Sequence, residues 1–209
     1  MTDFVHVSKH PLVLDGIARL RDAATGPREF RQVVADLARL LFMEAGADLK
    51  TAERTVQTPL ASCAGRRLSE RIGLFPILRA GLGMAEAILQ LVPEAQVWHL
   101  GLYRDHQTLK PVTYYNKLPP TPALDLAVVL DPMLATGGSA AAVIEILRHR
   151  AIGRIKFIGL IAAPEGVRAL RERFPDVPLH LGALDSHLNE MGYIVPGLGD
   201  AGDRQFGTG

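Results

Sequence analysis

Five short apolar runs, most of them separated by stretches with helical spacing, constrain the fold of this chain more than any other feature. Runs that are apolar throughout are typical of strands buried on both faces of a parallel sheet. Strands that alternate with helices are joined by right-handed crossovers, which keep the strands parallel. The sequence therefore predicts an α/β fold with a mainly parallel twisted sheet flanked by helices. The predicted strands are Ile72 to Leu78, Val97 to Leu102, Leu124 to Leu130, Ile155 to Ala162 and Val177 to Leu181.

Helical spacing is clearest in a segment that begins near Phe30 and continues through Leu41. Its apolar residues recur every three or four positions, and the pattern stops near Gly46, which is a helix end signal. We therefore expect a packing helix before the first predicted strand. Further helices are predicted between the strands, at Leu82 to Leu91, Ser139 to Arg150 and Pro164 to Phe174.

Two segments do not fit the alternation of strands and helices. Residues 104–122 are polar and proline-rich, and we interpret them as a protruding arm. Residues 185–209 carry six glycines and show no helical period, and we interpret them as a C-terminal hood, a functional loop segment at the edge of the fold. The 209 residues, 48% of them hydrophobic, are otherwise sufficient for one domain spanning 1–209.

Composition excludes several kinds of partner and site. Lys and Arg number 23 against 22 Asp and Glu, so the net charge of +1 gives no general attraction to nucleic acid or to an anionic membrane. Any anion site must therefore be local. The single cysteine, Cys63, cannot form an intrachain disulfide. The chain shows neither a signal-peptide pattern nor an apolar run of about 20 residues, so we expect a cytoplasmic protein.

The strongest chemical signal follows the run that ends at Leu130. Asp131 comes directly after it, and the sequence Thr136-Gly-Gly-Ser139 leads into the next predicted helix. Backbone N–H groups of glycines and two hydroxyls beside the positive end of a helix favour a phosphate. A carboxylate repels phosphate, so Asp131 needs a different partner, such as sugar hydroxyls.

A tight turn with a helix cap is the simpler interpretation of Thr136 to Ser139 taken alone. The preceding strand, the acid and the following helix together favour the phosphate site.

The segment Asp-Pro-Met-Leu-Ala-Thr-Gly-Gly-Ser resembles the phosphoribosyl pyrophosphate loop of type I phosphoribosyltransferases, in particular of their uracil-specific branch. Many members of the wider family carry a second acid where this chain has Pro132, and this departure weakens a purine or orotate interpretation. The resemblance implies that phosphoribosyl pyrophosphate binds to the whole loop, Asp131, Pro132, Met133, Leu134, Ala135, Thr136, Gly137, Gly138 and Ser139.

Two arginines match the pyrophosphate-binding positions of the same branch. Arg79 lies in the segment Pro76 to Met84, which resembles the family's pyrophosphate loop, and Arg104 matches a second pyrophosphate-binding arginine. Each has a simpler interpretation when taken alone. Arg79 would be a surface arginine in an ordinary strand-to-helix turn, and Arg104 would be solvated or paired with Asp105.

The tail from Tyr193 to Arg204 resembles the family's uracil-binding hood. In the family, main-chain groups at positions matching Ile194, Gly199 and Ala201 contact uracil, while the carboxylate matching Asp200, between the last two, serves the phosphoribosyl pyrophosphate side. The tail also matches the dinucleotide fingerprint Gly-x-Gly-x-x-Gly, but the chain ends too soon afterwards for a following strand-helix-strand unit, so we reject a nicotinamide site.

The resemblance, which covers nearly the whole chain, implies an enzyme of pyrimidine salvage. It would transfer the 5-phosphoribosyl group from phosphoribosyl pyrophosphate to uracil and give UMP and pyrophosphate. Asp131, Arg79 and Arg104 would act in catalysis, and Mg²⁺ would bind through oxygens of the substrate rather than in a protein cage. The sequence identifies no general base.

Two alternatives stay open at this point: an RNA-binding regulator built on the same fold, and a transferase for another base. The net charge of +1 and the intact hood favour the enzyme. We expect neither nucleic acid nor membrane as a partner, and the resemblance implies a homodimer or larger assembly. Some relatives are activated by GTP, which makes GTP a candidate activator.

Overall fold

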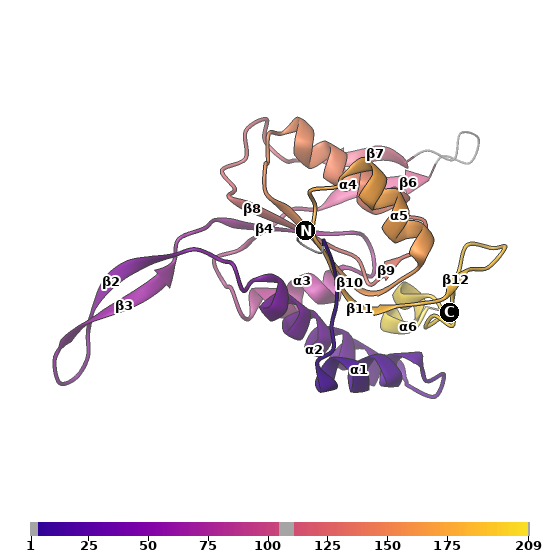
Figure 1. Cartoon of the computed structure of the whole chain (residues 1–209), viewed down its shortest axis with the longest axis horizontal. Helices are drawn as coiled ribbons and strands as arrows, with labels where there is room; N and C mark the ends of the chain where they lie inside the picture. Colours follow the sequence, from indigo (N-terminus) through magenta and orange to yellow (C-terminus); the bar gives the residue numbers. More distant parts are fainter. Residues whose placement is uncertain (1–3, 105–110, 209) are drawn as a thin grey trace.

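The computed structural model describes residues 4–104 and 111–208, with side chains except at 102–104, 111–114 and 116. Within these residues, a seven-stranded sheet forms the centre of the molecule (Figure 1). Every strand pair in it is parallel, which confirms the predicted α/β class. The strands in spatial order are β1 (Val5–Val7), β11 (Leu179–Leu184), β10 (Ile155–Ala162), β8 (Leu126–Leu130), β4 (Ile72–Pro76) and β5 (Gln96–Val97), and β9 (Met133–Leu134) pairs with β10.

Helices cover both faces of this sheet (Figure 1). Helices α1, α2 and α3 pack on one face, and α4 and α5 pack on the other. The predicted helices are all present, with ends within a few residues of the expected ones. The helices are α1 (Pro11–Arg21), α2 (Pro27–Ala45), α3 (Leu82–Leu89), α4 (Gly138–His149), α5 (Pro164–Arg173) and α6 (Ala201–Phe206).

Strand β8 shows why the predicted strands are apolar throughout. Its side chains alternate between the two faces, as the period of a strand requires. Leu126, Val128 and Leu130 join the hydrophobic cluster under α1 to α3. Ala127 and Val129 join the cluster under α4 and α5. Because β8 is covered on both faces, all five of its side chains are buried, and the run is apolar throughout.

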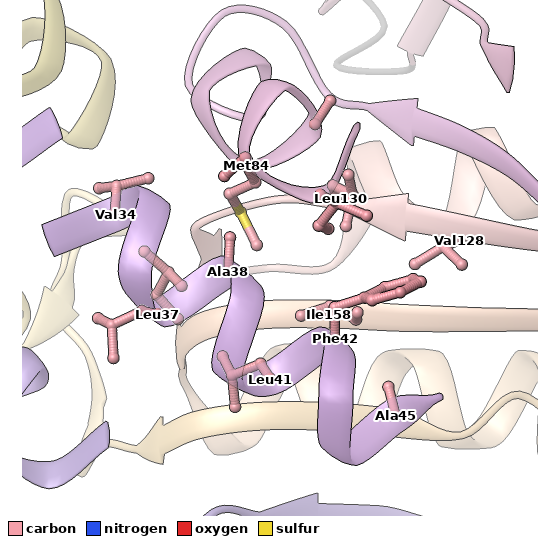
Figure 2. Packing of buried hydrophobic residues seen from close by; sticks show 14 of the residues in the cluster. Val34, Leu37, Ala38, Leu41, Phe42, Ala45, Met84, Val128, Leu130 and Ile158 are labelled. Atoms are coloured by element: carbon pink, nitrogen blue, oxygen red, sulfur yellow. The ribbon is translucent and has the colours of Figure 1, made fainter. Parts of the chain in front are cut away.

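Helix α2 supplies most of the cover on its face of the sheet. Figure 2 shows that one side of α2 points at the sheet, toward Val128 and Leu130 of β8 and Ile158 of β10, and at Met84 of α3. Leu41 lies on this side and is fully buried. The helical spacing of these apolar residues in the sequence therefore marks the face that packs on the core.

The predicted strand Val97 to Leu102 is wrong as a single element. Its first part is β5, which pairs with β4. Its second part belongs to β6 (Leu100–Arg104), which pairs with β7 (Pro111–Asn116) in a separate antiparallel hairpin. Leu100 forms an isolated bridge to Ile77, beyond the end of β4. Strand β6 therefore does not extend β5 along the main sheet. The hairpin lies at the start of the predicted arm, whose residues 105–110 are outside the described ones.

A second hairpin, which the sequence analysis missed, extends away from the body of the molecule (Figure 1). It consists of β2 (Thr51–Gln57) and β3 (Ser62–Leu68), and nearly all of its side chains are exposed. Because neither face is buried in this chain, the segment lacks the alternation of apolar and polar residues that identifies a strand.

The C-terminal hood contains a short hairpin and a helix. Strand β12 (His187–Leu188) pairs with β13 (Ile194–Val195), and α6 follows. The expectation of no helix in this tail is wrong. Asp200 caps α6 by accepting a hydrogen bond from the Asp203 N–H at 2.9 Å, and Gly207 ends it with a φ of 66°. A helix of six residues is too short to show a period in the sequence. In the described part of the chain, none of the helices has the length and hydropathy needed to cross a membrane.

Replacing Leu41 by Ala should lower the free energy of unfolding by about 2–5 kcal/mol, because the substitution leaves a cavity between α2 and the sheet. Urea denaturation monitored by circular dichroism would measure the loss. Met43→Ala on the same helix is the matched control, since Met43 is 67% exposed. Its effect should stay within about 0.5 kcal/mol. Equal effects of the two substitutions would contradict the packing described here.

Candidate active site

The candidate site lies at the edge of the sheet where the parallel strands β4 and β8 end. Two loops leave this edge side by side, because the Ile77 N–H donates a hydrogen bond to the Leu130 carbonyl at 2.8 Å. A Cβ on Gly81 would lie 2.5 Å from the same carbonyl oxygen, so only glycine lets the loops approach this closely. Leu130 directly precedes Asp131, and Gly81 follows Arg79 by two residues. The backbone therefore holds the two predicted anion-binding loops together.

The loop of residues 131–139, called here the Asp131 loop, is fixed to the strand beside it. The Pro132 carbonyl accepts hydrogen bonds from Leu160 and Ile161 of β10, at 3.1 and 3.0 Å. Gly137 caps α4 in the left-handed region with a φ of 79°. The start of α5 packs against the loop, where a Cβ on Gly166 would meet the Ala135 carbonyl oxygen at 2.3 Å. These contacts place the first turn of α4 next to the end of β8.

A cavity of about 230 Å³ opens over the Asp131 loop. Residues 133–140 and Asp131 form most of its wall, and Met191 and Gly192 of the hood complete it. Thr136 and Ser139 on this wall are exposed residues. Residues 191 and 192 thus bring the β12–β13 hairpin to the Asp131 loop.

Met191 and Gly192 were not among the predicted site residues. They form the turn of the β12–β13 hairpin, which Asn189 closes by accepting hydrogen bonds from the N–H groups of Met191 and Tyr193, at 3.0 and 2.9 Å. Asparagine followed by glycine within a few residues signals such a turn. The signal does not show what the turn touches, because the Asp131 loop is more than fifty residues earlier in the chain.

Asp131 has an unusual electrostatic environment. Burial raises the pKa of its carboxyl group to about 7, against the hydrogen bond from the Met133 N–H, which lowers the pKa. That hydrogen bond is 3.2 Å long. The side chain nevertheless lies on the cavity wall. A carboxylate held in this way has oxygens available for a donor that enters the cavity, and such a donor would stabilise the ionised form.

Arg79 contacts the hood. Its guanidinium forms an ion pair with Asp203 of α6 at 3.0 Å and lies 5.9 Å from the centre of the Phe206 ring. A Cβ on Gly202 would lie 3.7 Å from the same guanidinium and 3.2 Å from an Asp200 carboxylate oxygen. Arg79 and Asp200, both predicted site residues, are thus brought together. The ion pair with Asp203 was not predicted, because the two residues are 124 positions apart.

The predicted uracil contacts lie close together along the hood. Ile194 is a buried residue of β13, Gly199 is an exposed turn residue with a φ of 79°, and Ala201 is the buried first residue of α6. Asp200 caps the same helix. Their contacts with a base stay a prediction.

For Arg104 the structure describes only the backbone, which ends β6 opposite Pro111. Its predicted contact with pyrophosphate therefore falls outside the described side chains. Among the side chains that are described, no group of three or more His, Cys, Asp or Glu residues is arranged to hold a metal ion.

Comparison with known proteins gives concordant results. The profile of the uracil phosphoribosyltransferase family matches residues 7–208. A uracil phosphoribosyltransferase of Roseiflexus castenholzii is 63% identical over 98% of this chain and 99% of its own length. That of Symbiobacterium thermophilum is 55% identical over 98% of both chains.

Solved structures agree with this result. A protein from Aquifex aeolicus superposes with a TM-score of 0.89 at 39% identity and covers 98% of both chains. A hypoxanthine phosphoribosyltransferase from Staphylococcus aureus has a TM-score of 0.53 at 9% identity and covers 76% of both chains, a likeness of fold alone.

Asp131→Asn should raise the melting temperature at high pH. The folded carboxyl has a pKa of about 7. Its pKa in the unfolded chain is about 4, so the folded state loses stability as the pH rises from about 4 to about 7. At about pH 8.5 we expect the variant to melt about 5–15 °C above the unsubstituted protein, with a gap that shrinks toward pH 5. Differential scanning fluorimetry across this range measures the gap, and a gap independent of pH would show that the carboxyl titrates normally.

Proposed function

The chain belongs to the uracil phosphoribosyltransferase family, and we propose that the loops at the carboxyl edge of its sheet carry out that family's reaction. The enzyme transfers the 5-phosphoribosyl group from phosphoribosyl pyrophosphate to uracil, and UMP and pyrophosphate are formed. This reaction returns a free base to the nucleotide pool in pyrimidine salvage. The observation that supports our assignment of the site best is the cavity between the Asp131 loop and the hood, because the reaction requires sugar phosphate and base to meet.

In this proposal the Asp131 loop binds the 5′-phosphate. Gly138, Ser139 and Ala140 of the first turn of α4 line the cavity, and the positive end of the helix dipole favours an anion there. The exposed hydroxyls of Thr136 and Ser139 add donors at the same wall. Gly137 has a left-handed conformation and no side chain, so a ligand can approach its backbone closely.

Asp131 is proposed to hold the ribose through its hydroxyl groups. Two ribose hydroxyls can donate hydrogen bonds to a carboxylate, and these bonds offset the cost of burying its charge. The pKa of about 7 implies that a carboxylate and a neutral acid are both populated near neutral pH before substrate binds. Ribose binding would lower this pKa and fix the ionised form.

Arg79 and Arg104 are proposed to bind the pyrophosphate, on which negative charge grows as it leaves. Arg79 is half exposed and paired with Asp203 in the described structure, an exposed ion pair of the kind that contributes about 0–1 kcal/mol. A pyrophosphate carries more charge than one carboxylate, so it would compete effectively for the guanidinium. Arg104 enters on the resemblance alone.

Uracil is proposed to be recognised by main-chain groups at Ile194, Gly199 and Ala201, with Asp200 beside them. Uracil has both N–H donors and carbonyl acceptors, so fixed peptide groups can match its edge and leave an unpaired buried group when another base enters. N1 of the bound base would attack the anomeric carbon as the bond to pyrophosphate breaks, and N1 loses its proton. We assign no general base for that proton.

Magnesium is the proposed cofactor. The Asp131 carboxylate on the cavity wall offers the type of oxygen that Mg²⁺ accepts, and this ion commonly binds through one or two carboxylates and the phosphates of a substrate. When bound, it would neutralise part of the pyrophosphate charge. The residues of the chain supply orientation and fixed electrostatics around it.

We further propose a homodimer or larger assembly and a location in the cytoplasm. The β2–β3 hairpin supports the assembly: an isolated two-stranded hairpin is at best marginally stable in water, and this one packs neither face in its own chain. GTP as an activator is proposed on the resemblance alone.

The decisive experiment is to measure UMP formed from uracil, phosphoribosyl pyrophosphate and Mg²⁺. Adenine, hypoxanthine and orotate serve as competing bases in parallel reactions. We expect turnover with uracil and at least about 100-fold lower kcat/KM with the others, since a wrong base leaves polar groups of the hood unpaired. Comparable turnover with another base would overturn the assignment of the hood.

Arg79→Ala should lower kcat/KM for phosphoribosyl pyrophosphate by about 10-fold to 100-fold, because it removes a charge-assisted contact. Arg71→Ala is the matched control. Arg79 follows strand β4, whereas Arg71 directly precedes it. Arg71 forms its own exposed ion pair, with Asp125. The control should retain kcat/KM within about twofold. Equal losses in the two variants would remove Arg79 from the pyrophosphate site.

A further inference from the structure

Asp185 is a buried carboxylate that the proposed mechanism does not use. It follows β11, and its N–H is fixed to the end of β10 by a hydrogen bond to the Ala162 carbonyl at 2.7 Å. Its side chain is 1% exposed. A buried charge is costly unless it is paired and hydrogen-bonded. The partners of the Asp185 carboxylate therefore indicate its role.

All the described partners of this carboxylate lead to one residue of the hood, Gly197. The Asp185 carboxylate accepts a hydrogen bond from the Gly197 N–H at 2.8 Å. It also accepts two hydrogen bonds from the guanidinium of Arg21, the last residue of α1. The same guanidinium donates to the Gly197 carbonyl at 2.9 Å. Arg21 and Asp185 thus hold Gly197 by its N–H and by its C=O together.

Gly197 itself is fixed in one conformation. Its φ of 67° lies in the left-handed region, and a Cβ would lie 2.1 Å from the Ile194 carbonyl oxygen. Only glycine can occupy this turn. A glycine has many conformations in a free loop, so the orientation of this one depends on the bonds made by Arg21 and Asp185.

The next residue of the hood is held from the same side of the molecule. The Leu198 carbonyl accepts a hydrogen bond from Arg204 at 2.9 Å. Arg204 also donates to the carbonyls of Leu20 and Asp22, at the end of α1, and its guanidinium lies 4.5 Å from the centre of the Phe30 ring. Arg204 therefore anchors the hood to the turn between α1 and α2.

We propose that Arg21 and Asp185 are a positioning pair for uracil: they set the orientation of the two peptide groups that flank Gly197 and, through them, of the main-chain groups at Ile194 and Gly199. The inference rests on the proposed uracil site. Main-chain recognition of a base requires peptide groups held within about 0.5 Å of the productive geometry. Gly197 lies between the two proposed contacts in the sequence, so a change in its backbone torsions would move one contact relative to the other.

Charge and burial distinguish this pair from a surface ion pair. Arg21 brings two nitrogens to the carboxylate and one of them also to the Gly197 carbonyl, a fork that the single nitrogen of lysine cannot reproduce. Arg19, on the same helix, forms a conventional pair with Glu29 in which both side chains are about half exposed, and its described bonds do not reach the hood. The chain thus contains its own matched control.

The test is steady-state kinetics of Arg21→Gln, Arg21→Lys and Asp185→Asn, with Arg19→Gln as control. We expect Arg21→Gln and Asp185→Asn to raise KM for uracil by about 10-fold or more and to leave KM for phosphoribosyl pyrophosphate within about threefold, because a misplaced peptide weakens contact with the base. Arg21→Lys should give a partial effect. Arg19→Gln should leave both KM values unchanged.

A second measurement does not depend on turnover. Hydrogen exchange of the peptide spanning residues 194–200 should accelerate by about 10-fold or more in Arg21→Gln and Asp185→Asn but not in Arg19→Gln, since the Gly197 N–H loses its fixed acceptor geometry. If Arg21→Gln fails to fold, Asp185→Asn, which keeps the shape of the side chain, decides the outcome by the same two measurements.

The outcomes separate this inference from the proposed function. Absence of UMP formation by the unsubstituted enzyme would overturn the function, and the inference with it. Normal UMP formation with equal changes of both KM values, or with lower melting temperatures and unchanged KM for uracil, would overturn the inference alone. Unchanged hydrogen exchange in the hood would also overturn it.

Discussion

The close contact of two loop backbones at the carboxyl edge of the sheet is the constraint on which the rest of the structure depends. The Leu130 carbonyl accepts a hydrogen bond from the Ile77 N–H, and Gly81 lies against the same oxygen. This contact exists because β4 and β8 are adjacent and parallel, so their ends coincide. The buried apolar strands below fix that edge rigidly. Loops that carry Asp131 and Arg79 therefore start from positions that the hydrophobic core determines.

The hood is attached by a different kind of force. Hydrophobic burial is not directional, so it can hold Ile194 and Leu198 against the core without fixing how their peptide groups point. Hydrogen bonds to Arg21, Asp185 and Arg204 supply that direction. A buried ion pair is a weak source of net stability, but removing one partner leaves a buried charge and is strongly unfavourable. Such a pair defines geometry well.

The site combines these two kinds of support. The Asp131 loop keeps a carboxyl group in an environment that raises its pKa to about 7, which makes the folded enzyme less stable near and above neutral pH than it would be with a neutral side chain. The stable sheet beneath it tolerates this cost. Arg79 is paired with Asp203 at the surface. Rigid elements thus carry one carboxyl group in an environment that disfavours its charge and one arginine in an exposed ion pair.

Much of this protein follows from its sequence alone. Continuous apolar runs such as Leu126 to Leu130 predict buried parallel strands, because strands covered on both faces bury nearly all of their side chains. The residues that follow, from Asp131 to Ser139, predict a phosphate loop and resemble a known family, and the family is confirmed. The roles of Arg79, Arg104, Asp200 and the uracil contacts stay predictions.

The tertiary structure decided what local patterns do not contain. The β2–β3 hairpin packs neither face in its own chain, so its sequence lacks a strand period, and α6 is too short to have one. The pairing of Arg79 with Asp203 and of Arg21 with Asp185 joins residues 124 and 164 positions apart. Local spacing records only which face of an element is buried. Which distant side chains meet across an edge depends on how the whole chain packs, and only the folded structure contains that information.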